Sequence, residues 1–147
     1  MSEVTIYTDG CCLGNPSGCG GFGVVIIDGE NVEEFSQGYI STTNNRMELM
    51  GILSALENAP SNKALHIISD SQYAIGVASG EKNASKNLDL VNELRSVIQK
   101  RQNVRFTWVK GHAGNYYNER CDVLASEATN GFLILDCGYE ETKKGRN

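Results

Sequence analysis

The sequence lacks the features that mark membrane and secreted proteins. No apolar run approaches the roughly 20 residues that a helix needs to cross a bilayer, and the opening residues Met1-Ser2-Glu3 have neither the basic nor the apolar region of a signal peptide. The chain also contains no internal repeat and no stretch typical of an interdomain linker. We therefore expect a cytoplasmic protein without a membrane partner, and 147 residues are enough to build one full core.

Paired metal-binding cysteine motifs are missing as well. The chain has five cysteines, an odd number, and three of them, Cys11, Cys12 and Cys19, lie close together. No Cys-x-x-Cys pair follows them, and the nearest histidine is His66. The pattern favours reduced thiols that pack as small side chains over a structural zinc site.

Positive charge is scarce in the first third of the chain. No Lys or Arg precedes Arg46, and the formal net charge is -5. This balance argues against a strongly cationic nucleic-acid binder, although the basic residues farther along the chain allow one positive face beside an acidic one. The glycine-rich segment 10–23 lacks the Gly-Lys-Ser/Thr of a nucleotide-binding P-loop, and we interpret it as a loop.

Hydrophobic patterns predict a mixed sheet with helices packed on it. Alternation and short apolar runs predict strands over residues 4–8, 22–27, 32–39, 65–68 and 104–109. Apolar stripes and capping residues, among them Asn118, predict helices over residues 47–57, 71–78, 88–98 and 118–129. A hairpin-rich start followed by strand–helix alternation indicates an α/β fold. Ligands of such sheets bind outside the carboxyl ends of the strands.

Four carboxylates stand where a predicted strand ends or a predicted helix begins. They are Asp9, Glu48, Asp70 and Asp122. Acidic groups beside apolar faces are costly unless something compensates them, and repulsion among clustered carboxylates is best relieved by divalent cations. Each of them alone could be a capping or surface residue, but the four together predict a metal site.

Four segments that contain these acids resemble type 1 ribonuclease H in order and spacing over roughly residues 4–130. The segments are Thr8-Asp9-Gly10-Cys11-Cys12-Leu13-Gly14-Asn15-Pro16, Thr42-Thr43-Asn44-Asn45-Arg46-Met47-Glu48-Leu49, Ser69-Asp70-Ser71-Gln72-Tyr73, and Trp108-Val109-Lys110-Gly111-His112-Ala113-Gly114 with Asn118-Glu119-Arg120-Cys121-Asp122. The resemblance implies a ribonuclease H-like fold with a five-stranded mixed sheet, three strands antiparallel and then two parallel, and helices on both faces. It also implies a catalytic domain over residues 1–130, which leaves residues 131–147 as a C-terminal tail.

The same resemblance implies a function and a role for each matching residue. The family's activity is metal-dependent hydrolysis of the RNA strand of an RNA–DNA hybrid, which leaves 5'-phosphate and 3'-hydroxyl ends. Asp9, Glu48, Asp70 and Asp122 would hold two Mg²⁺ ions, with Mn²⁺ as a possible substitute, and His112 would shuttle a proton or assist product release. The residues that match hybrid-contacting positions are Cys12, Asn15, Thr43, Asn44 and Gln72.

One departure from the family concerns positive charge. Many bacterial relatives carry a basic, tryptophan-bearing protrusion between the second and third helices, whereas residues 76–87 here are short and contain only Lys82 and Lys86 as cations. Hybrid binding should therefore rest on fewer phosphate contacts. Tail cations, which are Lys143, Lys144 and Arg146, could compensate or could simply be solvated.

Two alternative functions stay open at this point. A module that only binds hybrids would gain nothing from a concentrated negative site that faces phosphates. A DNA-directed two-metal nuclease of the same broad fold would have no need for the neutral donors Asn15, Asn44 and Gln72, which suit recognition of the RNA 2'-hydroxyl. No large unexplained apolar surface is evident from the sequence, so we expect a monomer.

Overall fold

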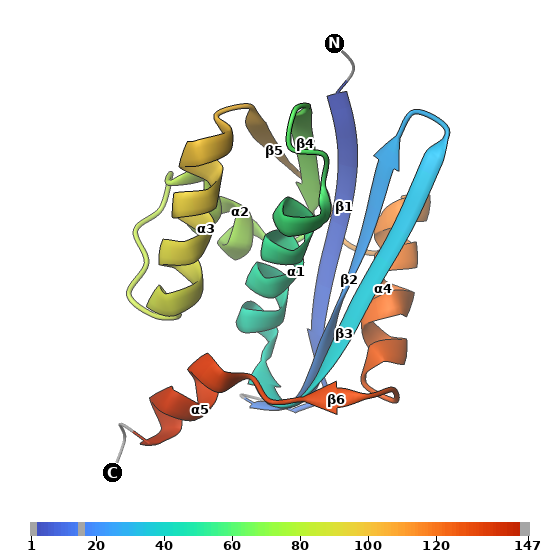
Figure 1. Cartoon of the computed structure of the whole chain (residues 1–147). Helices are drawn as coiled ribbons and strands as arrows, with labels where there is room; N and C mark the ends of the chain where they lie inside the picture. Colours follow the sequence, from blue (N-terminus) through green and yellow to red (C-terminus); the bar gives the residue numbers. More distant parts are fainter. Residues whose placement is uncertain (1–2, 15–16, 145–147) are drawn as a thin grey trace.

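A six-stranded mixed sheet in the order β5-β4-β1-β2-β3-β6 forms the centre of the computed structural model, which describes residues 3–14 and 17–144 (Figure 1). The strands are β1 (Glu3–Cys12), β2 (Ser17–Asp28), β3 (Asn31–Thr43), β4 (Ala64–Ser69), β5 (Val104–Trp108) and β6 (Leu133–Ile134). The helices are α1 (Asn44–Asn58), α2 (Gln72–Ser79), α3 (Leu88–Arg101), α4 (Tyr116–Ala128) and α5 (Cys137–Lys144). None of the helices within the described residues combines the length and apolar character that a membrane span requires.

The pairing of the strands agrees with the predicted topology. β1 runs antiparallel to β2, and β2 runs antiparallel to β3. On its other side β1 runs parallel to β4, which in turn runs parallel to β5. The carboxyl ends of β1 and β4 therefore meet at one edge of the sheet, which is where ligand sites form in such folds.

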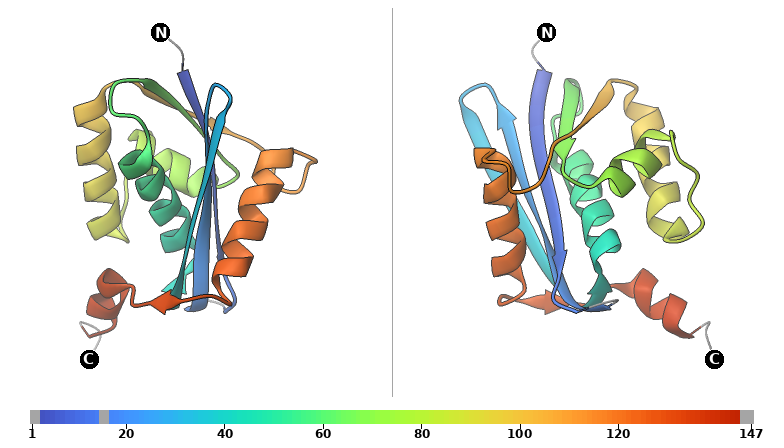
Figure 2. Two further views of the ribbon diagram at one scale, coloured as in Figure 1. Left: turned by 45° about the vertical axis from the view of Figure 1, so that its right-hand side comes forward. Right: turned by 180° about the vertical axis from the view of Figure 1, so that it is seen from behind.

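Helices cover both faces of this sheet, as predicted. Figure 2 shows α1 and α3 on one side and α4 on the other. The larger core lies under α1 and contains fully buried side chains such as Ile6, Val24 and Ile52. A smaller core joins Val25 to Cys121 and Leu124 of α4. Two apolar layers thus hold the sheet between them, and burial of these side chains supplies the main driving force for folding.

The prediction of a loop over residues 10–23 was wrong for most of that segment. β1 continues to Cys12, and β2 begins at Ser17. The glycines belong to the sheet because helices press closely against it: a Cβ on Gly10 would lie 2.5 Å from the backbone nitrogen of Glu48, and one on Gly21 would lie 2.7 Å from the carbonyl oxygen of Ala125. Glycine here permits the close approach of α1 and α4. In the sequence alone, such glycines cannot be told from the glycines of a flexible loop.

The predicted cap of the helix over residues 118–129 also needs correction. Asn115 caps α4, since its side chain accepts a hydrogen bond from the Asn118 backbone nitrogen at 3.0 Å, and Asn118 lies buried within the helix. At the start of α1, the Thr43 hydroxyl is the cap and accepts a hydrogen bond from the backbone nitrogen of Arg46 at 3.2 Å. Asn44 is the first residue of α1 rather than a cap.

The C-terminal segment, residues 131–144, adds elements that the sequence patterns did not predict. β6 extends the predicted five-stranded sheet to six strands by pairing in parallel with Gly38 and Tyr39 of β3. α5 follows and lies beyond the N-terminal end of α1 (Figure 1). Two residues of strand are too short for a periodic signal, so only pairing with an existing strand makes β6 recognisable.

Candidate active site

Three acidic side chains from three separate elements meet at the carboxyl-end edge of the sheet. Asp9 lies on β1, Glu48 lies on α1, and Asp70 follows β4. One carboxylate oxygen of each lies within 4.8 Å of the others. Asp9 is 5% exposed and Glu48 is 6% exposed, so two of the three acids are almost fully buried. We name these three residues the acidic cluster.

Burial and mutual repulsion make the charged state of the cluster costly. Burial, followed by the negative charge of Asp70, raises the pKa of Asp9 to about 8. Burial together with the charges of Asp9 and Asp70 raises the pKa of Glu48 well above its ordinary value. The Oε1 atom of Glu48 is buried and accepts no hydrogen bond from the described residues. Such a site lacks a positive partner.

The pKa of Asp9 predicts how the metal-free protein responds to pH. In the unfolded chain Asp9 loses its proton near pH 4, whereas in the folded protein it keeps the proton up to about pH 8. Folding stability without metal should therefore fall as the pH rises from about 4 to 8, because only the unfolded chain releases the proton readily. The free energy of unfolding in urea with a chelator, measured at pH 5 and at pH 8, checks this expectation.

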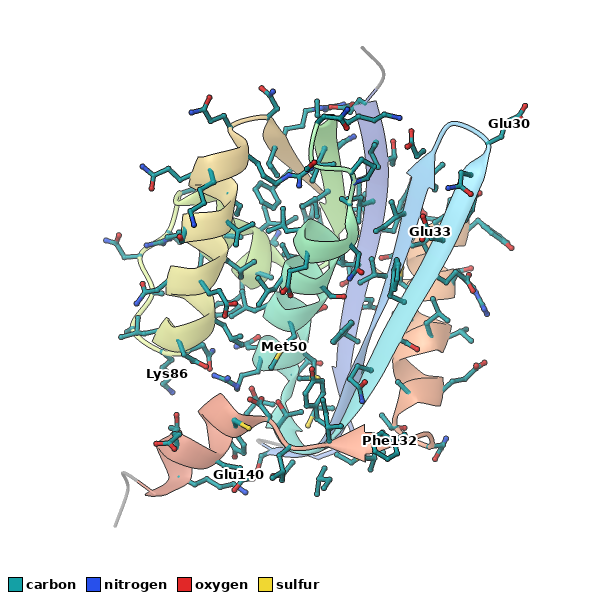
Figure 3. All side chains as sticks on the ribbon, viewed as in Figure 1. Glu30, Glu33, Met50, Lys86, Phe132 and Glu140 are labelled. Atoms are coloured by element: carbon teal, nitrogen blue, oxygen red, sulfur yellow. The ribbon has the colours of Figure 1, made fainter. Side chains whose placement is uncertain are left out.

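Two variants separate the Asp9 contribution from the rest of the titration. Asp9→Asn should lose less stability than the unaltered protein between the two pH values. Glu30→Gln, on the exposed hairpin between β2 and β3 (Figure 3), should behave like the unaltered protein. An equal pH response of all three proteins would show that Asp9 titrates normally.

Two residues that the sequence analysis did not single out position Asp70. The indole nitrogen of Trp108 donates a hydrogen bond to the backbone oxygen of Asp70 at 3.0 Å. Gly111 lies so close that a Cβ there would be 2.7 Å from Oδ2 of Asp70. Both residues belong to the segment 108–114 that contains His112. The composition of this segment does not show that it packs against Asp70.

Asp122 and His112 do not belong to the acidic cluster. Asp122 is half-buried on α4 and does not belong to the acidic cluster, although its negative charge contributes to the raised pKa of Asp9. His112 is exposed in the loop before α4, and its backbone has φ of 55°. The structure thus brings three of the four predicted acids into one group, with the fourth at a greater separation.

The predicted substrate-contacting residues surround the N-terminal ends of two helices. Thr43 and Asn44 start α1, and exposed Gln72 starts α2. Cys12 is half-buried at the end of β1, where its Sγ lies 3.6 Å from the backbone oxygens of Gly18 and Thr42. Asn15, the remaining predicted contact, lies outside the described residues.

An open groove extends from the start of α1 toward the C-terminal segment and encloses about 1050 Å³. Its walls come from the start of α1, the loop before α3, and α5. The residues that line it are Thr43, Asn44, Asn45, Ser85, Lys86, Asn87, Leu88, Asp89, Gly138, Tyr139, Glu141 and Thr142. In Figure 3, Lys86 and Glu140 mark the loop and the helix α5 on either side of this region.

An ion network centred on the buried Arg46 borders the groove, and the sequence analysis did not predict it. Arg46, 2% exposed, donates through Nε to Asp136 at 2.8 Å and through Nη2 to Asp89 at 2.7 Å. Asp136, 1% exposed, also accepts a hydrogen bond from the Thr42 hydroxyl at 2.7 Å. We name Thr42, Arg46, Asp89 and Asp136 the Arg46 cluster. Its two acids, Asp89 and Asp136, belong to no motif of the sequence, so no local sequence pattern identifies them as partners of Arg46.

The short connection before α3 packs back onto α2 instead of projecting as an arm. The backbone nitrogen of Lys82 donates to the Gly76 carbonyl at 3.0 Å, and Arg95 donates to the Lys82 carbonyl at 2.8 Å. Of the tail cations, Lys143 lies with Nζ 3.1 Å from the Ser41 hydroxyl, close to the start of α1. Arg146 lies outside the described residues.

The donor set of the acidic cluster fits a hard divalent cation. Its oxygens come only from carboxylates, the ligand class that Mg²⁺ and Mn²⁺ favour. The unpartnered Glu48 oxygen and the raised pKa of Asp9 both reflect negative charge without compensation. A bound dication would supply that compensation, and the partly open side toward Asp70 leaves room for further oxygen ligands.

Comparisons with known proteins agree on one family. The family model described as RNase H matches residues 1–130. A ribonuclease H of Pseudoalteromonas atlantica is 40% identical over 154 aligned residues, which cover 95% of this chain and 99% of the relative. A ribonuclease H of Pectobacterium atrosepticum is 43% identical over 151, covering 94% of this chain and 97% of the relative.

Solved structures lead to the same family. RNase H1 of the halophilic archaeon Halobacterium salinarum superimposes with a TM-score of 0.75 at 25% identity, covering 88% of this chain and 98% of that one. LC11-RNase H1, solved in complex with an RNA/DNA hybrid, superimposes with a TM-score of 0.74 at 26% identity. That alignment covers 86% of this chain and 96% of the other.

Proposed function

Because this chain belongs to the ribonuclease H family, we propose that it is an endonuclease that hydrolyses the RNA strand of RNA–DNA hybrids and requires Mg²⁺. The products would carry 5'-phosphate and 3'-hydroxyl ends. The observation that carries the proposal is the acidic cluster, in which three carboxylates converge within 4.8 Å at the strand ends. A monomeric, cytoplasmic enzyme stays a prediction from the sequence.

The proposed chemistry assigns the metal to the acidic cluster. Asp9, Glu48 and Asp70 provide the nearest ligands, and Asp122 faces the same site from α4. Bound Mg²⁺ ions would activate a water molecule for attack on the phosphodiester and stabilise the leaving 3'-oxygen. Asp9 and Glu48, held by β1 and α1, keep their carboxylates in place before any cation arrives, so little reorganisation is needed.

Neutral side chains around the cluster are proposed to recognise the substrate. The family resemblance assigns Cys12, Asn15, Asn44 and Gln72 to the hybrid near the cut and Thr43 to a DNA-strand phosphate. Hydroxyl and amide groups can hydrogen-bond an RNA 2'-hydroxyl without demanding a charged partner. The exposed positions of Asn44 and Gln72 at two neighbouring helix starts support this assignment.

The decisive experiment compares matched duplexes of one sequence. RNA–DNA, DNA–DNA and RNA–RNA duplexes are incubated with the protein, with Mg²⁺ and with a chelator, and the labelled strands are resolved by length. Cleavage of only the RNA strand of the hybrid, and only with Mg²⁺, is the expected result. Cleavage of DNA duplexes would favour a DNA-directed nuclease, and hybrid binding without cleavage would favour a binding module.

Salt dependence should report how few phosphates the protein contacts. Each phosphate contact contributes a slope of about -0.9 to log affinity against log salt on a duplex, so we expect a shallow total slope. Lys143, whose Nζ lies 3.1 Å from the Ser41 hydroxyl on β3, follows the groove-lining residue Thr142 along the chain. Lys143→Ala should flatten the slope by about one unit while the turnover number at saturating substrate changes little.

A matched lysine provides the control for that measurement. Lys63 pairs with Asp28 at 2.8 Å, away from the groove-lining residues. Lys63→Ala should leave the salt slope unchanged. If Lys143→Ala also leaves it unchanged, phosphate contacts come from other cations, such as Lys86 of the groove.

A further inference from the structure

The C-terminal segment lies beyond the family match to residues 1–130, yet it contacts the part of the molecule that is proposed to bind substrate. β6 joins the edge of the sheet through β3, whose last residue is Thr43. α5 then lines the groove together with the start of α1. The segment therefore touches the strand and the helix on either side of the β3–α1 junction.

Asp136 hydrogen-bonds to that junction on both sides, at Thr42 and at Arg46. Its carboxylate accepts from the Thr42 hydroxyl at 2.7 Å and from Nε and Nη2 of Arg46 at 2.8 and 3.0 Å. Thr42 and Arg46 stand immediately before and after the residues 43–45 that line the groove. One buried carboxylate thus fixes both ends of the short stretch that contains Thr43 and Asn44.

Arg46 also links the junction to α3. Its guanidinium also binds both carboxylate oxygens of Asp89, at 2.9 and 2.7 Å, at the start of α3. Thr43 caps α1 by accepting a hydrogen bond from the Arg46 backbone, so the main chain and side chain of Arg46 are both engaged. Arg46 therefore connects the start of α1, the start of α3 and the residue that precedes α5, and these three helices contribute residues to the walls of the groove.

The packing against this network is tight at Gly138. Gly138, the second residue of α5, lies so close that an added Cβ would collide with Oδ2 of Asp89 and with Nη2 of Arg46. Tyr139 is buried directly after it, and its backbone nitrogen donates to Asp136 at 3.2 Å. The segment is thus seated by close packing as well as by charge.

We propose that the C-terminal segment is a positioning element for hybrid binding: through Asp136 it holds Thr42 and Arg46, and thereby sets the geometry of Thr43 and Asn44 at the mouth of the groove. This inference rests on the proposed function. A buried ion pair is weak evidence for net stability, whereas in some proteins it fixes one specific geometry. The segment then belongs to the working enzyme and is more than a tail.

Binding rather than chemistry should depend on this contact. Glu48 lies farther along α1, where Met47, Leu49 and Ile52 are fully buried in the main core. Glu48 is therefore held by the body of α1, whereas the β3–α1 junction is held by the pairing of Thr42 and Thr43 with β2 and by the Arg46 cluster. Loosening the cluster should raise the KM for hybrid and leave kcat nearly unchanged.

The test measures KM and kcat of the full-length protein on one RNA–DNA hybrid at saturating Mg²⁺, well below the melting temperature of each variant. Asp136→Asn keeps the shape of the side chain but removes its charge, and we expect KM to rise about tenfold with kcat within about twofold. Gly138→Ala keeps every charge and displaces α5, so it should shift KM in the same direction. Asp28→Asn, which breaks the distant ion pair with Lys63, is the matched control and should change neither constant.

Each outcome decides the proposal. A folded Asp136→Asn with unchanged KM, or with a loss confined to kcat, overturns it, even if the melting temperature falls. If circular dichroism shows that Asp136→Asn does not fold, Gly138→Ala and Asp89→Asn decide in its place, and an unchanged KM in both overturns the proposal. Failure of the unaltered protein to cleave the hybrid would instead reject the proposed function, and the positioning role with it.

Discussion

Replacing Asp9 by asparagine is expected to abolish hybrid cleavage and to leave the fold intact. Asp9 belongs to the acidic cluster, and one of its carboxylate oxygens lies within 4.8 Å of a carboxylate oxygen of each of the other two acids. Asparagine has nearly the same shape but cannot supply the negative charge that a divalent cation needs. In the metal-free protein, folding near neutral pH requires Asp9 either to take up a proton or to stay charged in a crowded, buried group, and asparagine removes that cost. We therefore expect a slightly higher melting temperature alongside the loss of activity.

Cleavage assays with Mg²⁺ and thermal melts with a chelator test the two halves of this expectation on the same preparation. Asp70→Asn should give the same pair of results, because Asp70 belongs to the same group. Asp28→Asn, in an ion pair with Lys63 elsewhere, should retain activity. Retained cleavage by Asp9→Asn, or a clearly lowered melting temperature, would contradict the assignment of Asp9 as a metal ligand.

Removing the imidazole of His112 should slow turnover without stopping it. The metal ligands remain in place, so only the proton-transfer or product-release step that the imidazole assists should slow down. We expect the turnover number to fall by about 10- to 1000-fold. The backbone at His112 has φ of 55°, a region that asparagine tolerates better than alanine. His112→Asn therefore removes the imidazole with the least backbone strain, and His112→Ala serves as its companion.

The turnover number at saturating hybrid and Mg²⁺ is the measurement for both variants. The second histidine of the chain supplies a control: His66 lies on β4 and hydrogen-bonds to Thr107 of β5 at 2.6 Å. His66→Asn should turn over at the rate of the unaltered protein when assayed below its melting temperature. An unchanged rate for His112→Asn would make His112 an ordinary loop residue.

The elements that carry the acidic cluster were predictable because their signals are local. The alternation along residues 4–8 and the apolar run of 65–68 identify β1 and β4, whose parallel pairing brings Asp9 and Asp70 to one edge. The stripe along 47–57 identifies α1, and the family motif then assigns Glu48 to the same site. The family, the sheet with helices on both faces and the grouping of these three acids all followed from such patterns.

Tertiary structure decided the features that depend on close approach between distant segments. The glycines of residues 10–23 belong to strands because α1 and α4 press on them, and a pattern of glycines cannot distinguish that from a loop. Likewise, the separation of Asp122 from the other three acids depends on where α4 settles against the sheet.

The sequence by itself determined which residues are acidic, where most of the helices and strands of residues 3–130 form, and which family motifs the chain contains. It could not determine what residues 131–144 do, because their two-residue strand and single buried aspartate have no periodicity of their own. Only the folded chain, with Arg46 placed between Asp89 and Asp136, gives those residues a place beside the groove. Pairwise contacts across 90 residues are set by packing and burial of charge, which no local pattern encodes.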